Sequence, residues 1–194
     1  MPNWCENIAT FSHKDKEVLS KLANAFIQCN PFNTFVPIPD GYRAVEATYS
    51  PNEDELKEYE KRREELKQRY GYTTSYDFAC GEWGTKWEPS CEIEQINIVT
   101  TTSGNTDCYT FSVNFYSAWT PPIEFYQHLI DDYGFDVDAH YFEGGLVFAG
   151  SFDSNGSDYY EFNSLEELPY YLIELFSLQD EIERIREETE AEQV

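Results

Sequence analysis

The stretch CYTFSVNFYSAW (108–119) restricts the fold of this chain more than any other segment. Its apolar and polar residues alternate with a period of two, which is the spacing of a β-strand with one buried face. The apolar side chains on that face are Tyr109, Phe111, Val113 and Phe115. A second run, CEIEQINIVTT (91–101), precedes it and is joined to it by TSGNTD. Together the two runs predict a β-hairpin.

The remaining elements follow from the same reasoning about period and turn residues. We expect strands at 6–13, 135–143, 146–152 and 158–162. Amphipathic spacing predicts helices at 14–28 and 121–134. The stretch 30–41 contains three prolines, which predicts an extended loop.

Two further helices carry much of the charge. Ser50 and Pro51 suit the start of a helix, and residues 51–70 are predicted to form a charged helical insertion. Ser164 and Glu167 match a capping box, which predicts a C-terminal helix and a frayed acidic tail over 164–194, although Pro169 could mark the true first turn. Residues 1–163 are then one domain that includes the insertion.

The order of these elements is strand, helix, insertion, hairpin, helix, strands and terminal helix. This order predicts an α+β fold with a ferredoxin-like antiparallel sheet, packed helices, an inserted charged helix and a C-terminal helix. Aromatic residues make up 17% of the 194-residue chain, which favours a sheet because aromatic rings suit a half-buried pleated surface.

The charge is large and unevenly distributed. The chain has 37 Asp and Glu against 13 Lys and Arg, for a net charge of −24. No Lys or Arg occurs between Lys86 and Arg184, while the interval 87–183 holds 19 Asp or Glu. This balance argues against direct binding to nucleic acid through a basic surface and against binding to anionic membranes. Without a signal peptide or a CxxC pair, we expect a cytoplasmic protein with free thiols.

Acidic residues on a rigid surface can present charge as the phosphates of a duplex do, so that a basic groove built for DNA or RNA accepts the protein. We therefore expect a basic partner protein that normally binds nucleic acid. The candidate contact residues are Glu92, Glu94, Asp131, Asp132, Asp136, Asp138, Asp153, Asp158, Glu161, Glu166, Glu167 and Glu174.

The stretch GEWGTKWEPS (81–90) has two interpretations. Trp83, Lys86, Trp87 and Trp119 could line an aromatic cleft that stacks a nucleotide base. Alternatively, tryptophans beside Gly and Pro fix a loop over the sheet, and the lysine stem lies on an indole ring. We favour the second interpretation, in which the lysine between the tryptophans is a feature of the fold.

The sequence shows no catalytic pattern, and we expect no enzyme activity. His13, His128 and His140 lie far apart with no metal-ligand spacing, and no cysteine pair has that spacing either. No GxSxG, Walker loop or GxGxxG occurs, so no cofactor is predicted. DSNGSD (153–158) lacks the full calcium-loop register and is interpreted as a hairpin turn.

Four motifs occur together in this order: MPNWCENI (1–8), WGTKW (83–87), FYSAWTPP (115–122) and HYFEGGLVFAG (140–150). They resemble the Api92-like family, which has a YubB-type ferredoxin-like domain and is carried by phages and plasmids. The resemblance implies a ferredoxin-like fold and a mobile-element origin, and it supplies no catalytic residues. It does not extend to the 52–70 helix or the C-terminal helix. The family pattern leads us to expect more basic character after WGTKW, whereas WEPSCEIEQ opens the base-free stretch here.

These observations predict an acidic protein that binds and inhibits a basic host protein, such as a defence nuclease or a CRISPR effector, by nucleic-acid mimicry. Two alternatives stay open. One is a small-ligand or nucleotide-binding module that uses the tryptophans, and the other is a structural protein that forms homodimers through the C-terminal helix.

Overall fold

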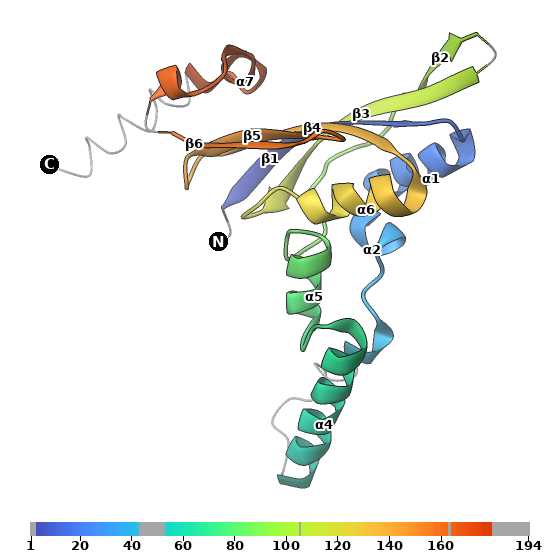
Figure 1. The fold of residues 1–194 in the computed structure, drawn as a ribbon, viewed down its shortest axis with the longest axis vertical. Coiled ribbons are helices and arrows are strands. Elements are labelled where there is room, and N and C mark those ends of the chain that lie inside the picture. Colours follow the sequence, from blue (N-terminus) through green and yellow to red (C-terminus); the bar gives the residue numbers. More distant parts are fainter. Residues whose placement is uncertain (1–2, 43–52, 105, 163, 180–194) are drawn as a thin grey trace, which may run out of the picture.

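The protein folds as a six-stranded antiparallel sheet with helices on both sides (Figure 1). The structure, a computed structural model, describes residues 3–42, 53–104, 106–162 and 164–179. The strands are β1 (Trp4–His13), β2 (Val99–Ser103), β3 (Thr106–Ala118), β4 (Asp136–Glu143), β5 (Phe148–Asp153) and β6 (Gly156–Glu161). The helices are α1 (Lys16–Ile27), α2 (Pro31–Phe35), α4 (Glu53–Tyr70), α5 (Ser75–Glu82), α6 (Ile123–Tyr133), the 3-10 turn η1 (Leu165–Glu167) and α7 (Tyr170–Leu175).

The strand order is β2-β3-β1-β4-β5-β6. β1 lies between β3 and β4 and runs antiparallel to both, and β2 runs antiparallel to β3. α1 follows β1 and α6 joins β3 to β4, and both helices lie on the same side of the sheet (Figure 1). This is the split βαβ arrangement of ferredoxin-like folds. The predicted α+β class is confirmed, and β5 and β6 extend the sheet beyond β4 as an antiparallel meander.

The main core lies between the sheet and the layer formed by α1 and α6. Odd-numbered residues of β1, β3 and β4 point into it, as the period of two requires. Phe11 is at its centre, paired with Phe111 on one side and Val137 on the other. Its ring centroid lies 5.5 Å from that of Phe26 on α1 and 5.4 Å from that of Phe111. Each such buried ring contributes roughly 2 kcal/mol to stability.

The predicted loop at 30–41 was wrong for its first part, because residues 31–35 form the short helix α2. Pro31 stands at the first helical position, where its missing N–H costs no hydrogen bond. Phe32 and Phe35 are buried against the core, so tertiary packing stabilises a turn of helix that the proline count argues against.

The predicted hairpin is present, but its first strand is shorter than expected. β2 covers only residues 99–103, and residues 91–98 form no strand. Ser90 makes a single antiparallel bridge to Tyr116. Beyond this bridge, three partly buried isoleucines of the segment pack against the core: Ile93, Ile96 and Ile98. These isoleucines are apolar because they pack against the core, although the segment forms no ladder of strand hydrogen bonds. For this reason the sequence pattern wrongly predicted a strand here.

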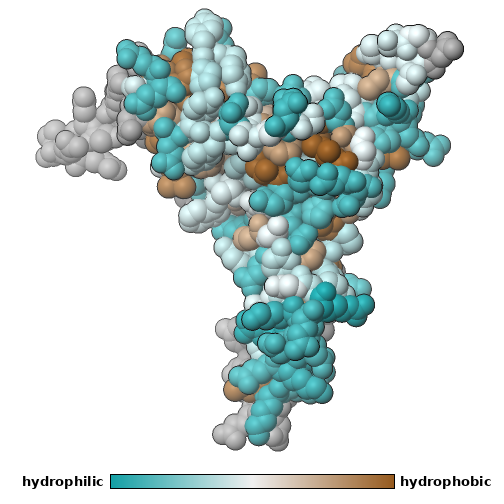
Figure 2. All heavy atoms as spheres, viewed as in Figure 1, coloured by the Kyte–Doolittle hydropathy of each residue, from teal (hydrophilic) through white to brown (hydrophobic). Residues whose placement is uncertain are grey.

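The charged helix predicted for 51–70 is present as α4, which extends away from the sheet (Figure 1). The surface of α4 is almost entirely hydrophilic (Figure 2), and Arg62 forms an ion pair with Glu58 one turn away at 3.1 Å. Leu66 and Tyr70 pack against the core at its base. The expected cap at Ser50 lies outside the described residues. Helix α5 was not predicted.

The C-terminal helix differs from its prediction. Residues 165–167 form a 3-10 turn, and α7 begins only after Pro169, the alternative start. α7 lies on the side of the sheet opposite α1 and α6 (Figure 1). Its buried residues Leu172 and Ile173 pack with Phe142 and Ala149 of the sheet. The predicted continuation into 180–194 lies outside the described residues.

Candidate functional site

The sheet has one face that packs against α1 and α6 and one that does not; we call the second the open face. Alternation assigns to it the even-numbered residues of β1, β3 and β4, and the paired register continues it onto β5 and β6. Part of the open face is covered by α7, where Tyr171 Oη lies 3.3 Å from Ser151 Oγ.

Beyond α7 the open face carries hydroxyl side chains on β1 and β3, together with the exposed aromatic side chains of Trp4 and Tyr116. Hydroxyl pairs link β1 to β3 at Thr10 with Ser112 and at Ser12 with Thr110, both at 2.8 Å. No Lys or Arg occurs in any of the five strands β1, β3, β4, β5 and β6. These strands therefore present oxygen acceptors with no lysine or arginine among them.

Carboxylates of the open face lie beside these hydroxyls. On β4, Asp136 pairs with Ser12 and Asp138 pairs with Thr10, and both side chains are exposed. Asp158 on β6 pairs with Ser151 on β5, so it projects to the same face. Asp153 ends β5 at the hairpin turn. These carboxylates, Asp136, Asp138, Asp153 and Asp158, all belong to the acidic set predicted from the sequence.

The carboxylate of Asp153 also shapes its turn. It accepts hydrogen bonds from the backbone N–H of Asn155 at 2.7 Å and from its side-chain amide at 3.2 Å. These bonds hold the pKa of Asp153 below its ordinary value. The interpretation of DSNGSD as a hairpin turn is therefore confirmed.

Three more acids of the predicted set lie on the same side of the sheet, in the segment that includes α7. Glu166 and Glu167 belong to η1, and both are exposed. Glu174 on α7 accepts a hydrogen bond from Tyr170 Oη at 2.7 Å. The open side therefore gathers seven of the acids in the predicted set.

The other predicted acids lie elsewhere. Asp131 and Asp132 are on α6, on the opposite side of the sheet, and each contacts a neighbour on its own helix. Glu161 pairs with the core residue Phe148 and so faces the α6 side. Glu92 and Glu94 belong to the irregular segment 91–98. The structure thus divides the predicted acidic set between two sides of the sheet, which the alternation alone could not decide.

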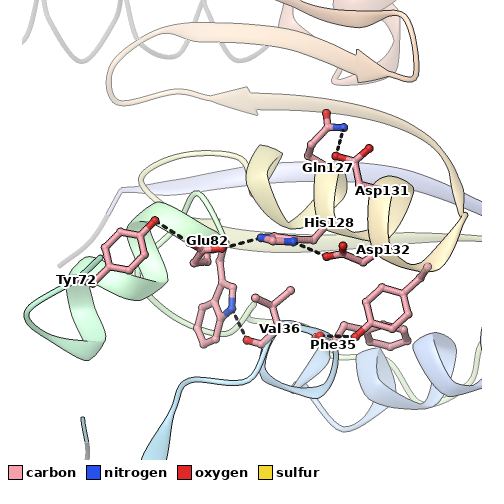
Figure 3. A network of polar contacts seen from close by, with 10 residues as sticks. Phe35, Val36, Tyr72, Glu82, Gln127, His128, Asp131 and Asp132 are labelled. Atoms are coloured by element: carbon pink, nitrogen blue, oxygen red, sulfur yellow. Dashed lines mark hydrogen bonds and ion pairs between the residues drawn. The ribbon is translucent and has the colours of Figure 1, made fainter. Parts of the chain in front are cut away.

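A polar network on the α6 side was not predicted (Figure 3). His128 Nε2 lies 2.8 Å from Glu82 Oε2, and its Nδ1 lies 2.8 Å from Asp132 Oδ2. Tyr72 donates its hydroxyl to the other oxygen of Glu82 at 2.8 Å, which raises the pKa of Tyr72 to about 12. The network joins α5, α6 and the turn before α5. The i, i+4 spacing of His128 and Asp132 on a predicted helix is the one sequence feature that could have revealed it.

Burial by itself would lower the pKa of His128, but the carboxylates of Asp132 and Glu82 outweigh it and raise that pKa above its ordinary value. Both ring nitrogens contact carboxylates, and the network links α5 to α6.

The tryptophan and lysine residues do not form one cleft. Trp83 is 2% exposed and donates its indole N–H to the carbonyl of Val36 at 2.9 Å, so it belongs to the core. Trp87 and Trp119 are 49% and 45% exposed. Lys86 Nζ lies between them, 3.9 Å from the ring centroid of Trp87 and 4.9 Å from that of Trp119. The chain's own ammonium group therefore occupies the space between the two exposed indoles.

The loop that carries these residues is fixed to the end of β3. Thr85 donates its hydroxyl to the carbonyl of Ala118 at 2.8 Å, and the backbone N–H of Trp119 donates to the carbonyl of Asn3 at 2.9 Å. Trp119 has a φ of 75°, a conformation that bulky residues adopt only where their surroundings impose it. These contacts agree with the interpretation of Lys86 and the tryptophans as part of the fold.

Among the described residues, no three His, Cys, Asp or Glu side chains are placed to hold a metal ion together. None of the described helices is long and apolar enough to cross a membrane.

No protein-family model matches the chain, and no curated protein matches it. The chain is similar to the crystal structure of a protein api92 from Yersinia pseudotuberculosis, with a TM-score of 0.36 and 10% sequence identity, over 88% of this chain and 100% of that chain. This likeness is a weak relation between folds and assigns no residue a role.

Proposed function

We propose that this protein binds a basic partner protein, one that normally binds DNA or RNA, through the open face of its sheet. The observation that carries the proposal is the common orientation of Asp136, Asp138, Asp153 and Asp158. They project from three adjacent strands onto a face whose strands contain no Lys or Arg. From the motif resemblance we propose that the protein is an Api92-like protein of a phage or plasmid, and from its cysteines and N-terminal sequence that it acts in the cytoplasm of a bacterial host.

The geometry supports this partner chemistry. Asp136 and Asp138 are two residues apart on one strand, so their side chains are separated by roughly 7 Å, and adjacent strands are roughly 4.8 Å apart. Lys and Arg side chains of a nucleic-acid groove can pair with carboxylates at such intervals as they pair with phosphates. The neighbouring hydroxyl groups of Thr10 and Ser12 add uncharged hydrogen-bond acceptors, which do not repel the nearby carboxylates.

Competition with nucleic acid follows from this mode of binding. A partner whose basic groove is filled by the open face cannot hold DNA or RNA there, so the protein acts as an inhibitor. The net charge of −24 also accelerates encounter with a basic protein at low salt.

The test compares two variants with equal net charge. The open-face variant carries Asp136→Asn, Asp138→Asn, Asp153→Asn and Asp158→Asn. The matched control carries Glu92→Gln, Glu94→Gln, Asp131→Asn and Glu161→Gln. Each variant loses the same number of negative charges, so a difference between them reports position and not overall charge.

Each protein is used to capture partners from a bacterial lysate at about 50 mM and about 300 mM salt, with duplex DNA as competitor. We expect wild type and control to retain nucleic-acid-binding proteins at low salt and to release them to salt or duplex. The open-face variant should retain about tenfold less. Equal retention by the two variants would refute the assignment of binding to the open face.

A further inference from the structure

Two cysteines far apart in the sequence meet beside the core. Cys29 follows the C-terminal end of α1, and Cys91 follows the bridge between Ser90 and Tyr116. Their sulfur atoms lie 3.0 Å apart. The Cys29 thiol also lies 3.0 Å from the carbonyl oxygen of Cys91, and the Cys91 thiol lies 3.2 Å from that of Phe26. Each sulfur is thus held in place by the segment that carries the other.

The backbone of Cys29 supports a role for its side chain. Its φ is 50°, in the left-handed region that favours glycine at the end of a helix. α6 ends in this usual way, with Gly134 at a φ of 75°. A cysteine at the corresponding position of α1 carries a conformational cost that glycine does not. The contact with Cys91 explains why a side chain stands there.

We propose that Cys29 and Cys91 form a reversible intramolecular disulfide, and that this pair is a site of oxidative modification by low-molecular-weight disulfides. One thiolate attacks the disulfide oxidant and releases one thiol. The second thiolate then attacks the resulting mixed disulfide and releases the other. The cysteine pair loses two protons and two electrons, and the oxidant is reduced to two thiols.

Both thiols are free in the structure and half-buried. The oxidant can therefore reach them, but partial burial slows its reaction. Burial and the neighbouring Cys29 raise the pKa of Cys91 to about 12. Since the thiolate is the reactive form, closure of the disulfide is expected to be slow at neutral pH and faster as the pH rises.

The cross-link would tie the end of α1 to the segment that precedes β2. The enclosed chain includes α2, α4 and α5. It also includes Glu88, whose carboxylate accepts hydrogen bonds from the backbone N–H groups of Phe32 and Asn33 in α2. Oxidation would restrict the conformations of the unfolded chain. It would therefore stabilise the folded oxidised form, with these contacts, relative to the reduced form.

The test exposes the full chain to oxidised glutathione, followed by alkylation of free thiols, mass spectrometry of the intact chain and peptide mapping. After oxidation we expect the intact chain to have lost two free thiols and to carry no covalently bound glutathione. Peptide mapping should show a peptide that joins Cys29 to Cys91, and the melting temperature should be higher. The Cys80→Ser/Cys108→Ser variant, which lacks the more accessible of the other cysteines, should form the same cross-link. The Cys29→Ser variant lacks one of the two sulfur atoms and should form none of it.

Peptide mapping of the wild-type chain shows whether Cys29 and Cys91 are joined, even where a variant folds poorly. Stable glutathione adducts on Cys29 and Cys91 without the joined peptide would overturn the proposal, as would a cross-link that uses Cys5, Cys80 or Cys108. A cross-link between two chains would overturn it as well. None of these outcomes bears on binding by the open face, because Cys29 and Cys91 lie on the other side of the sheet from Asp136 and Asp158.

Discussion

His128 Nε2 lies 2.8 Å from Glu82 Oε2, and this contact joins α6 to α5 (Figure 3). The other ring nitrogen contacts Asp132 on the same helix, so the imidazole is held between two carboxylates. Only a protonated ring donates to both. The charged form therefore fits the folded state better than the unfolded state.

The His128→Gln variant is expected to lose the stability that this arrangement provides at acidic and neutral pH. Because the folded-state pKa is raised above 6.5, the contribution is complete below 6.5 and is lost as the pH rises through the folded-state value. Its size is about 1 kcal/mol or less, since the ring is partly exposed to solvent.

Urea denaturation at pH 5.5, 7 and 8.5 measures this difference. The free energies of unfolding of wild type and His128→Gln should converge at the highest pH. His140→Gln is the matched control, because the carboxylate of Asp138 lies 3.7 Å from the His140 ring, farther than the two carboxylates that contact His128. A constant difference between wild type and His128→Gln across the three values would contradict the prediction.

Glu88 gives a second pH dependence, in a lower range. Its carboxylate oxygens lie 2.7 Å from the backbone nitrogen of Asn33 and 3.0 Å from that of Phe32. Burial raises the pKa of Glu88 from 4.5 to about 7, against the effect of these two donors. Between these values the folded state keeps a proton that the unfolded state has released. The contribution of Glu88 to stability therefore falls as the pH rises from 4.5 to about 7 and is level beyond that window.

The Glu88→Gln variant should lack this fall, because glutamine does not titrate. Denaturation curves at pH 4.5, 5.5 and 6.5 provide the measurement, and Glu92→Gln, on an exposed side chain four residues on, is the control. If Glu88→Gln and wild type lose stability in parallel across this range, another group is responsible.

Lys86 permits a test of the interpretation that the tryptophan motif belongs to the fold. The Lys86→Met variant keeps an apolar stem between Trp87 and Trp119 but removes the charge that faces both rings. We expect a loss of about 1 kcal/mol in the free energy of unfolding and a change in tryptophan emission. Lys14→Met, at an exposed lysine, should change neither. If a nucleotide quenches the emission of wild type but not of Lys86→Met, the alternative of a ligand cleft gains support.

Strong periodicity made much of the fold predictable from the sequence. Phe111, Val113 and Phe115 do lie on one buried face, and Gly134 does end α6, because alternation and a helix-ending glycine are local properties. The order of elements was then enough for the split βαβ plan. The predictions for residues 31–35 and 91–98 were wrong, because long-range packing of Phe32 and Ile96 decides the conformation of these two segments.

The candidate site was harder to predict for the same reason. Alternation puts Asp136 and Asp138 on one face of their own strand, since they are two residues apart. It could not show that Asp158 joins them while Asp131 lies across the sheet, since only the register between strands and the position of α6 decide this. The contact of His128 with Glu82 and that of Cys29 with Cys91 join segments distant in sequence, so neither could be read from local spacing.

Leu172 tests whether α7 is part of the folded sheet. It is fully buried among Phe142, Ala149 and neighbouring residues of the C-terminal segment, whereas Leu175 on the same helix is 41% exposed. Leu172→Ala should cost about 2–5 kcal/mol, because it leaves a cavity, and should free α7 for proteolysis before the sheet unfolds. Leu175→Ala should cost well under 1 kcal/mol. Limited proteolysis with denaturation curves compares the two. Equal sensitivity would mean that α7 does not pack on the open face.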